Sequence, residues 1–227
     1  MGFSGHQARK RFGQHWLRDQ SVLERILEAA ALEPTDRVLE VGPGRGALTE
    51  RLLAAEVGAV HAIELDRDLV AGLQDRFATN PRFSLHQGDV LEAPLDLSDG
   101  RMADKVVANI PYNITGPLLD RLVGRLERHV DPPYRRLVLL VQKEVAERIR
   151  ARPGHSSFSA LSVRMQLLAR CHSVCPVPPR CFQPPPKVQS EVICLEPLPA
   201  SERLEPALAA RVESLLKQAF LARRKML

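Results

Sequence analysis

A tetrapeptide of unusual chemical content follows a short apolar segment near the middle of the chain. Asn109, Ile110, Pro111 and Tyr112 come directly after Val-Val-Ala at residues 106–108. The side-chain oxygen of Asn109 and the backbone carbonyl of Ile110 can both accept hydrogen bonds, whereas Pro111 has no N–H group that would compete. Tyr112 offers a flat ring on which a base could stack. A strand-ending turn with a packed tyrosine is the alternative explanation of this motif.

These groups suit one kind of nucleophile, an exocyclic aromatic amine. The lone pair of such an amine is delocalised into the ring, so the amine attacks poorly. Two acceptors that hold its N–H groups favour a more pyramidal nitrogen and free the lone pair. No strong general base is needed, because the nitrogen becomes acidic once it is alkylated. Catalysis would therefore consist mostly of orientation.

A glycine-rich loop, "LEVGPGRGA" at residues 39–47, places Gly42, Gly44 and Gly46 between an expected strand and an expected helix. Glycines let the backbone approach a ligand closely, and the helix N-terminus that follows offers free N–H groups to a negative group. The spacing Gly42-x-Gly44-x-x-Ala47 also fits the dinucleotide fingerprint. The loop alone therefore does not separate a nicotinamide cofactor from another adenosine-bearing one, and a purely structural turn is the third possibility.

Two acids follow the glycine loop at the ends of successive expected strands. Glu64 lies 18 residues after Gly46, and Asp89 lies in "HQGD" at the end of the next strand. Glu64 can accept hydrogen bonds from both ribose hydroxyls of a nucleoside, and Asp89 can accept one from an adenine amine. Either acid alone would be taken as an exposed strand-end residue. Together they follow the rule that ligands of open α/β sheets bind at the carboxyl ends of strands, which predicts an adenosine-containing ligand.

Short apolar segments alternate with amphipathic ones, which predicts an α/β fold with a parallel sheet covered by helices on both faces. Expected strands cover residues 37–42, 59–65, 83–89, 104–109 and 136–142, with a late strand at 187–196. The first expected helix begins near Asp19 or Ser21. Further helices are expected over residues 47–56, 67–78, 116–130 and 143–152. About the last 25 residues are expected to form one amphipathic helix.

The overall composition excludes several classes of protein. The chain has 227 residues, of which 44% are hydrophobic and 26% are charged, as in ordinary globular proteins. It has no apolar run of 18 residues and no apolar region of a secretory signal, so we expect no membrane association. The four cysteines match no familiar zinc spacing, so we expect reduced thiols and no metal site.

Positive charge is concentrated in three places. Arg9, Lys10 and Arg11 are consecutive, residues 121–152 carry nine Lys or Arg against four Asp or Glu, and residues 211–227 carry five against one. The net charge of +5 permits a polyanionic partner. Solvated helix faces would explain the same clusters, and a surface that contacts phosphates is the sharper hypothesis.

The motifs together resemble a known family. "EVGPGRG", Glu64 in "IELD" and "NIPY" resemble a class I S-adenosylmethionine-dependent methyltransferase that acts on an adenine amine. "RKRFGQHWLRD", "VQKEVAERI" and "PPRCFQPPPKVQSEV" more narrowly resemble the ribosomal RNA adenine dimethyltransferases, in their small-subunit branch. The resemblance runs from about residue 9 to residue 225.

The resemblance implies a Rossmann-like sheet with an antiparallel last hairpin and a small C-terminal helical domain. It implies transfer of methyl groups from S-adenosyl-L-methionine to two adjacent adenines of small-subunit rRNA, with a small ribosomal subunit precursor as partner. We accordingly expect a cytoplasmic enzyme, active as a monomer. The expected domains are a basic arm at residues 1–18, the methyltransferase domain at 19–199 and an incomplete helical domain at 200–227.

The resemblance also assigns residues to the site. The Tyr112 and Phe182 rings would sandwich the target base, although Phe182 read by residue type alone could equally be core packing. His15 lies where an asparagine is often found in the family, and Trp16 lies where the family has a phenylalanine. The family's cofactor contacts fall on His15, Leu17, Gly42, Gly44, Glu64, Asp89 and Asn109.

The C-terminal segment carries an apolar stripe that needs a partner to bury it. The stripe is formed by Leu204, Leu208, Val212, Leu215 and Ala219. No second strongly periodic helix follows it, so the chain is expected to be truncated relative to its family.

Three alternatives to the small-subunit enzyme stay open. Large-subunit adenine dimethyltransferases of the macrolide-resistance type share the fold and an "NIPY"-type motif, but "QKEVAER" and "FQPPPKV" favour the small-subunit branch. A non-catalytic RNA-binding assembly factor is disfavoured because Glu64, Asp89 and the tetrapeptide are intact. A nicotinamide oxidoreductase fits the glycine loop but leaves "NIPY" and the basic clusters unexplained.

Overall fold

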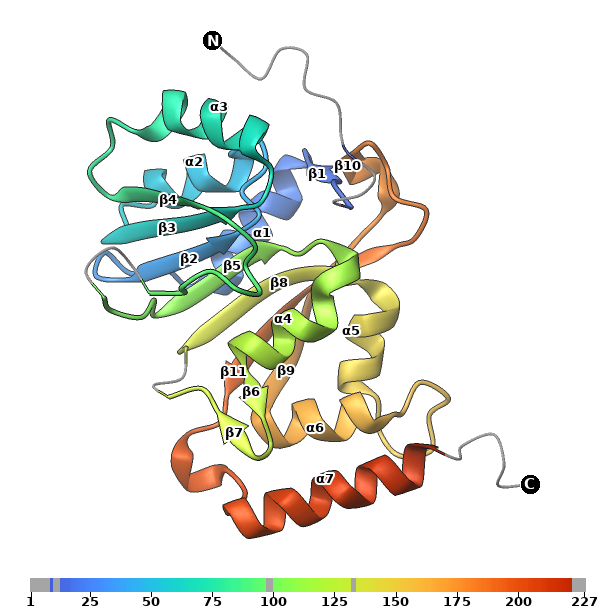
Figure 1. The fold of residues 1–227 in the computed structure, drawn as a ribbon. Helices are drawn as coiled ribbons and strands as arrows, with labels where there is room; N and C mark the ends of the chain where they lie inside the picture. Colours follow the sequence, from blue (N-terminus) through green and yellow to red (C-terminus); the bar gives the residue numbers. More distant parts are fainter. Residues whose placement is uncertain (1–8, 10–12, 97–99, 132–133, 222–227) are drawn as a thin grey trace.

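A seven-stranded sheet forms the centre of the molecule in the computed structural model, which describes residues 9, 13–96, 100–131 and 134–221 (Figure 1). The strands lie in the order β4-β3-β2-β5-β8-β11-β9. In chain order they are β2 (Arg37–Val41), β3 (Ala59–Glu64), β4 (Phe83–Gln87), β5 (Lys105–Asn109), β8 (Arg136–Gln142), β9 (Ala169–Val177) and β11 (Ser190–Pro197).

The first five strands of this sheet are parallel to one another, and only β11 runs in the opposite direction, between β8 and β9. Strand β11 pairs antiparallel with β8, from Ser190 opposite Gln142 to Leu195 opposite Leu137, and β9 pairs antiparallel with β11. The chain starts at β2, moves to β3 and β4 on one side, and returns to β5 and β8 on the other. The strand order therefore reverses between β2 and β5, and such switch points are where open α/β sheets bind ligands.

Each face of the sheet carries its own hydrophobic core. Neighbouring residues of one strand divide between the two, so Val38 lies in one core and Leu39 in the other. Helices α1 (Gln20–Ala30), α2 (Ala47–Ala54) and α3 (Arg67–Phe77) cover the first face. Helices α4 (Thr115–Leu122), α5 (Lys143–Arg150) and α6 (Ala160–Leu168) cover the second (Figure 1). Burial on both faces explains why the strands are almost continuously apolar. The predicted α/β fold is confirmed.

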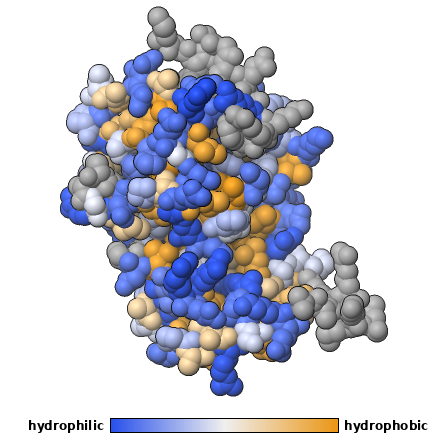
Figure 2. Space-filling model, in the orientation of Figure 1, coloured by the Kyte–Doolittle hydropathy of each residue, from blue (hydrophilic) through white to orange (hydrophobic). Residues whose placement is uncertain are grey.

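The outer surface of these layers is mostly polar. On the face seen in Figure 2, hydrophilic residues predominate, and hydrophobic ones form small groups between them. On this face, polar side chains therefore lie toward the solvent, as expected where the apolar sides of helices pack on a sheet.

The helix expected over residues 116–130 is wrong in its second half. Helix α4 ends at Leu122, and a short hairpin of β6 (Gly124–Arg125) and β7 (Arg128–His129) follows. Gly124 has a φ of +93°, in the left-handed region, and a Cβ at this position would lie 2.8 Å from the Arg128 carbonyl oxygen. A glycine that permits this turn ends the helix, although the apolar periodicity continues beyond it. The residue patterns did not predict α6 and β9, which follow Pro153 and its polar neighbours. The antiparallel last hairpin implied by the family resemblance is present as β9 and β11.

The apolar stripe expected near the C-terminus is confirmed for Leu204 and Val212, which pack against the core, and is wrong for Leu208, Leu215 and Ala219, which are exposed. In α7 (Pro206–Leu221), Leu208 and Leu215 are 46% and 62% exposed. The helix instead turns Ala209 and Leu216 into the core. Glu213 of α7 accepts two hydrogen bonds from the Arg164 guanidinium of α6, at 2.8 and 2.6 Å. This charged pair fixes the rotation of the helix, which periodicity alone did not.

The arm before α1 is anchored to a late segment of the chain. Strand β1 (Trp16–Leu17) pairs antiparallel with β10 (Phe182–Gln183), and Leu17 lies opposite Phe182. This small sheet lies beside the carboxyl ends of β2 and β5 in Figure 1. Among the described residues, no helix has the length and apolar content needed to cross a membrane.

The turn at Gly124 gives a test of the fold. Gly124→Ala should lower the free energy of unfolding by about 1–3 kcal/mol, because the methyl group meets backbone atoms in a left-handed conformation. Gly116→Ala in α4 is the matched control, since nothing lies within 4 Å of its Cβ position. The control should be neutral or more stable by up to about 1 kcal/mol. Urea denaturation of both variants makes the comparison, and equal midpoints would contradict the account of the turn.

Candidate active site

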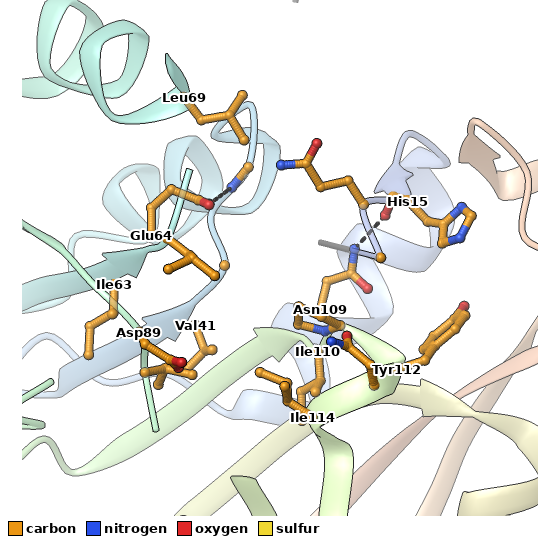
Figure 3. A pocket seen from close by; sticks show the side chains of 18 of the residues that line it. His15, Val41, Ile63, Glu64, Leu69, Asp89, Asn109, Ile110, Tyr112 and Ile114 are labelled. Carbon is orange, nitrogen blue, oxygen red and sulfur yellow. Dashed lines mark hydrogen bonds between the residues drawn. The ribbon is translucent and has the colours of Figure 1, made fainter. Parts of the chain in front are cut away.

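A cavity opens at the carboxyl edge of the sheet, where the strand order reverses (Figure 3). Its walls come from the arm, the glycine loop after β2, the ends of β3 and β5, and the segment after β4. It is lined by Gly13, Gln14, His15, Trp16, Val41, Gly42, Gly44, Ile63, Glu64, Leu65, Leu69, Gly88, Asp89, Val90, Asn109, Ile110, Pro111, Tyr112, Asn113 and Ile114. The fold therefore brings the glycine loop, both acids and the tetrapeptide to one place.

The glycine loop is shaped by the arm that packs on it. Gly42 and Gly44 have φ angles of +67° and +59°, which side chains rarely adopt. A Cβ on Gly44 would lie 2.9 Å from Cδ1 of Trp16, so the loop needs glycine for the contact with the arm as well. The Arg45 guanidinium lies 3.8 Å above the Trp16 ring, a cation–π contact that holds the arm against the loop.

Glu64 is held by the backbone on both of its oxygens. Oε2 accepts from the Gly44 N–H at 3.0 Å, and Oε1 accepts from the Asp66 N–H at 2.9 Å. The residue is only 6% exposed, and burial raises the pKa of its carboxyl despite these hydrogen bonds. Each carboxylate oxygen has more than one lone pair, so each can also accept from a hydroxyl in the cavity. Two such acceptors at the end of β3 fit a vicinal diol.

Asp89 faces the same cavity from the segment after β4. Its Oδ1 accepts from the Leu91 N–H at 2.9 Å, which fixes the side chain in a local turn. The residue is partly exposed, unlike Glu64. A carboxylate in this position can accept a hydrogen bond from an amine at the cavity edge.

The amide of Asn109 has a defined orientation. Its Nδ2 donates to the His15 carbonyl of the arm at 2.9 Å, so its Oδ1 points away from that carbonyl (Figure 3). The next residue is anchored, because the Ile110 N–H donates to the Leu140 carbonyl at 3.2 Å and its side chain is 1% exposed. Pro111 then starts the short helical turn Tyr112–Ile114. The amide oxygen is thus presented on a rigid segment.

Tyr112 is fixed at both its hydroxyl and its ring. The hydroxyl shares a hydrogen bond with the Ser190 hydroxyl at 2.5 Å, and burial raises the phenol's pKa, which keeps Tyr112 neutral. The His15 ring stacks on Tyr112 with centroids 5.8 Å apart and an angle of 24° between the planes. Nδ1 of His15 lies 2.8 Å from the Pro184 carbonyl oxygen, within hydrogen-bond reach.

Two residues assigned by resemblance do not line this cavity in the described part of the chain. Leu17 and Phe182 are 6% and 4% exposed and pack in the core between the sheet and α1. Their pairing in β1 and β10 turns both side chains inward. His15, rather than Phe182, therefore contacts the Tyr112 ring in this structure.

Sequence reasoning missed the contacts that hold the arm over the cavity. Gln14 Nε2 donates to Asp66 Oδ2 at 2.9 Å, and Arg9 Nη1 donates to Asp66 Oδ1, also at 2.9 Å. Asp66 is the N-cap of α3, and its position two residues after Glu64 is the sequence feature that could have identified it. Neither a metal-binding group of three or more His, Cys, Asp or Glu nor a disulfide is present in the described residues.

A second buried acid supports the loop from within β2. Glu40 Oε2 accepts from the Thr49 hydroxyl of α2 at 2.7 Å, which ties the strand to the helix on either side of the glycine loop. Burial, with a smaller contribution from the charge on Glu64, raises the pKa of Glu40 to about 8. Glu40 is therefore mostly protonated at neutral pH in the folded protein.

The sheet order and the carboxyl-edge cavity define a Rossmann-like methyltransferase. Two solved structures of methyltransferases have the same fold and are more than 30% identical to this chain. A dimethyladenosine transferase from Plasmodium falciparum is 32% identical, with a TM-score of 0.79 over 94% of this chain and 73% of that one. The 23S rRNA methyltransferase ErmE is 31% identical, with a TM-score of 0.74 over 92% of this chain and 80% of that one.

Sequence comparison identifies the family. The model of the ribosomal RNA adenine dimethylase family matches residues 5–227, and the chain belongs to this family. A Synechococcus protein (strain CC9605) named ribosomal RNA small subunit methyltransferase A is 88% identical over all of this chain and 83% of its own length. A protein of the same name from Parasynechococcus marenigrum (strain WH8102) is 79% identical over all of this chain and 75% of its own length. The methyl donor of this site is S-adenosylmethionine.

Glu40→Gln should remove one source of pH-dependent stability. The folded state keeps the Glu40 proton up to about pH 8, whereas the unfolded chain releases it near the ordinary pKa of 4.5. The folded state therefore binds more protons in this window, so the stabilisation is fully present below about pH 4.5 and is lost as the pH rises to about 8. Glutamine can still accept from Thr49 and carries no charge.

The comparison needs urea denaturation of both proteins at two pH values. At about pH 4 the two free energies of unfolding should be nearly equal. At about pH 9 the variant should be the more stable by roughly 2–5 kcal/mol. A difference that stays constant with pH would show that Glu40 titrates normally.

Proposed function

We propose that this protein transfers methyl groups from S-adenosylmethionine to the exocyclic amines of two adjacent adenines in small-subunit ribosomal RNA, giving dimethyladenosines. The observation that carries the proposal is the Asn109 amide, held with its oxygen toward a cavity that also contains the Glu64 carboxylate. The identity of 88% to a relative named for the small-subunit reaction favours this RNA over the large-subunit one. The intact site favours an enzyme over a non-catalytic assembly factor.

On the cofactor side, the proposed roles follow the geometry of the walls. Glu64 accepts from the two ribose hydroxyls, and Asp89 accepts from the adenine amine. Gly42 and Gly44 leave room for the methionine part to approach the backbone, since a Cβ on either would sit on a backbone of positive φ. His15 and Leu17 contribute through the arm; for Leu17 the contact must be made by its backbone, because its side chain is buried in the core.

On the substrate side, the tetrapeptide binds and orients the amine. Asn109 Oδ1 and the Ile110 carbonyl accept from the two N–H groups, and Pro111 offers no competing donor. The cofactor supplies an electrophilic methyl group on a sulfonium sulfur. The amine nitrogen forms the new C–N bond as the C–S bond breaks, and the alkylated nitrogen then loses a proton. A monomethylated amine keeps one N–H group, so it can bind again and react a second time.

The target base stacks on Tyr112 in this proposal. Its entry requires the His15 ring to leave the face that it covers. Phe182 can serve as the second ring only after β10 separates from β1, because the side chain is buried against α1 in the described arrangement. We further propose that the protein works as a monomer in the cytoplasm, on a small ribosomal subunit precursor.

Removal of the Glu64 carboxylate separates cofactor binding from RNA binding. Glu64→Ala should weaken S-adenosylmethionine binding by about 1.5–3 kcal/mol for each hydrogen bond to the carboxylate that is lost. Affinity for small ribosomal subunits should change little, because the carboxylate is buried beneath the cofactor site. Isothermal titration with each ligand makes the measurement. An unchanged cofactor affinity would remove Glu64 from the proposed site.

The tetrapeptide should control turnover rather than cofactor affinity. Asn109→Ala removes one acceptor, and a loss of about 1.5–3 kcal/mol of transition-state stabilisation corresponds to a roughly 10- to 100-fold lower kcat. Tyr112→Ala should also lower kcat, because base–aromatic stacking contributes about 1–3 kcal/mol. Tyr112→Phe is the control, since it keeps the ring and loses only the contact with Ser190. The assay is methyl transfer to small subunits that lack the modification, and normal turnover of Asn109→Ala would contradict the proposed role.

A further inference from the structure

The segment that crosses the cavity, residues 13–17, is bonded at both of its sides, and we call it the strap. On one side, Gln14 reaches Asp66 beyond the end of β3. On the other, the His15 carbonyl accepts from the Asn109 amide at the end of β5. Strand β2 lies between β3 and β5, so the strap spans the whole width of the site. Its two bonded residues are adjacent in sequence, and displacement of one therefore displaces the other.

Gln14 has an orientation set by two partners. Its Oε1 accepts from the Arg9 N–H at 2.8 Å, while its Nε2 donates to Asp66 Oδ2 at 2.9 Å. Both bonds require the same orientation of the amide. Asp66 is 1% exposed, so the bond to its carboxylate is shielded from water and is charge-assisted.

Asp66 connects the strap to the cofactor carboxylate. Its backbone N–H donates to Glu64 Oε1 at 2.9 Å, and its side chain caps α3 by accepting from the Asp68 N–H at 3.2 Å. Glu64 in turn accepts from Gly44 in the glycine loop. A continuous series of hydrogen bonds thus runs from Gln14 through Asp66 to Glu64.

We propose that Gln14 is a positioning residue, which clamps the strap onto Asp66 and so sets the Glu64 carboxylate and the Asn109 amide at the same time. This inference rests on the proposed function of the site and adds to it the residue that couples its two halves. With the clamp closed, the Asn109 oxygen faces the amine and Glu64 faces the ribose. With the clamp open, the Asn109 amide loses the His15 carbonyl that orients it, and the cofactor site loses one wall.

The clamp also affects how long the cofactor stays bound. The strap lines the cofactor cavity, so an open strap would leave S-adenosylmethionine with fewer contacts. Two methyl groups must reach each amine, and each transfer consumes one cofactor. The strength of the Gln14–Asp66 bond should therefore influence the rate of cofactor release in each round of transfer.

An exchanged pair tests the clamp directly. Gln14→Glu places two carboxylates against each other and should open the strap. Asp66→Asn combined with Gln14→Glu restores the contact with donor and acceptor exchanged, because the introduced asparagine amide can donate to the introduced glutamate carboxylate. The double variant keeps an acceptor at position 14 for the Arg9 N–H, and an amide oxygen at position 66 for the Arg9 guanidinium and for the cap of α3, since asparagine caps helices as well as aspartate does. Arg67→Ala is the matched control, because this neighbouring side chain is 82% exposed.

The readout is the rate of S-adenosylmethionine dissociation from the full chain. Trp16 is the only tryptophan in the sequence and lies in the strap, so its fluorescence reports strap movement in stopped-flow mixing. Gln14→Glu should release the cofactor at least about tenfold faster, as expected for loss of one charge-assisted hydrogen bond. The double variant should return to within about twofold of the parent rate, and Arg67→Ala should match the parent. In methyl transfer to small subunits, Gln14→Glu should lower kcat and leave the KM for the RNA unchanged.

The possible negative results distinguish a failure of the proposed function from a failure of the clamp alone. A parent protein that binds no S-adenosylmethionine would overturn the proposed function itself. A parent that binds it, with Gln14→Glu releasing it at the parent rate or with no recovery in the double variant, would overturn only the clamp. If Asp66→Asn fails to fold in any combination, Gln14→Ala replaces it, because that change leaves the cap of α3 intact. Gln14→Ala should release the cofactor faster than the parent, and an unchanged rate would likewise reject the inference.

Discussion

The buried carboxylate of Glu64 is the interaction on which the site depends. It accepts from the glycine loop through Gly44 and from the start of α3 through Asp66. Those two segments belong to successive βα units, which the Glu64 side chain links. Arg76 of α3 adds a second link, because it donates to the Arg45 carbonyl of the loop at 3.1 Å. A buried carboxylate is costly unless its lone pairs are used, so both backbone segments are held at hydrogen-bond distance from it. The hydrogen bonds that Glu64 requires therefore help to shape the wall of the cavity formed by the glycine loop and the start of α3.

The two edges of the sheet show why this acid is available for a ligand. At the amino edge, buried Asp36 is paired with Lys105 at 2.7 Å and with Arg135, so its charge is compensated by cations. At the carboxyl edge, Glu64 is held by N–H groups, which leave lone pairs for hydroxyls. The two buried acids therefore have different roles at the two edges of the sheet. Asp36, paired with cations, holds neighbouring strands together, whereas Glu64, bonded to backbone N–H groups, faces the cavity.

The sequence predicted those parts of the molecule that depend on local patterns. Apolar runs, glycines and strand-end acids placed β2, β3 and β5 and brought Gly42, Glu64 and Asn109 to one edge, because a parallel sheet leaves few other arrangements. What could not be predicted depends on side chains far apart in sequence. The rotation of α7 is set by the Arg164–Glu213 pair, and its apolar residues fit more than one rotation. The inward turn of Phe182 follows from pairing with Leu17, across most of the chain.

The strap gives the same lesson for function. Its residues looked like an irregular basic arm, because contacts with a loop and a helix cap carry no periodicity. In the fold, those contacts make the arm a third wall of the cavity and place the His15 ring on Tyr112. Under the proposed function, this one segment would line the cofactor site and cover the ring on which the base stacks. In the proposed reaction, a base that stacks on Tyr112 would displace the His15 ring, while the His15 carbonyl would stay to orient Asn109. Rotation of the His15 side chain alone would meet both requirements, and the backbone of the strap would then stay in place as the base enters.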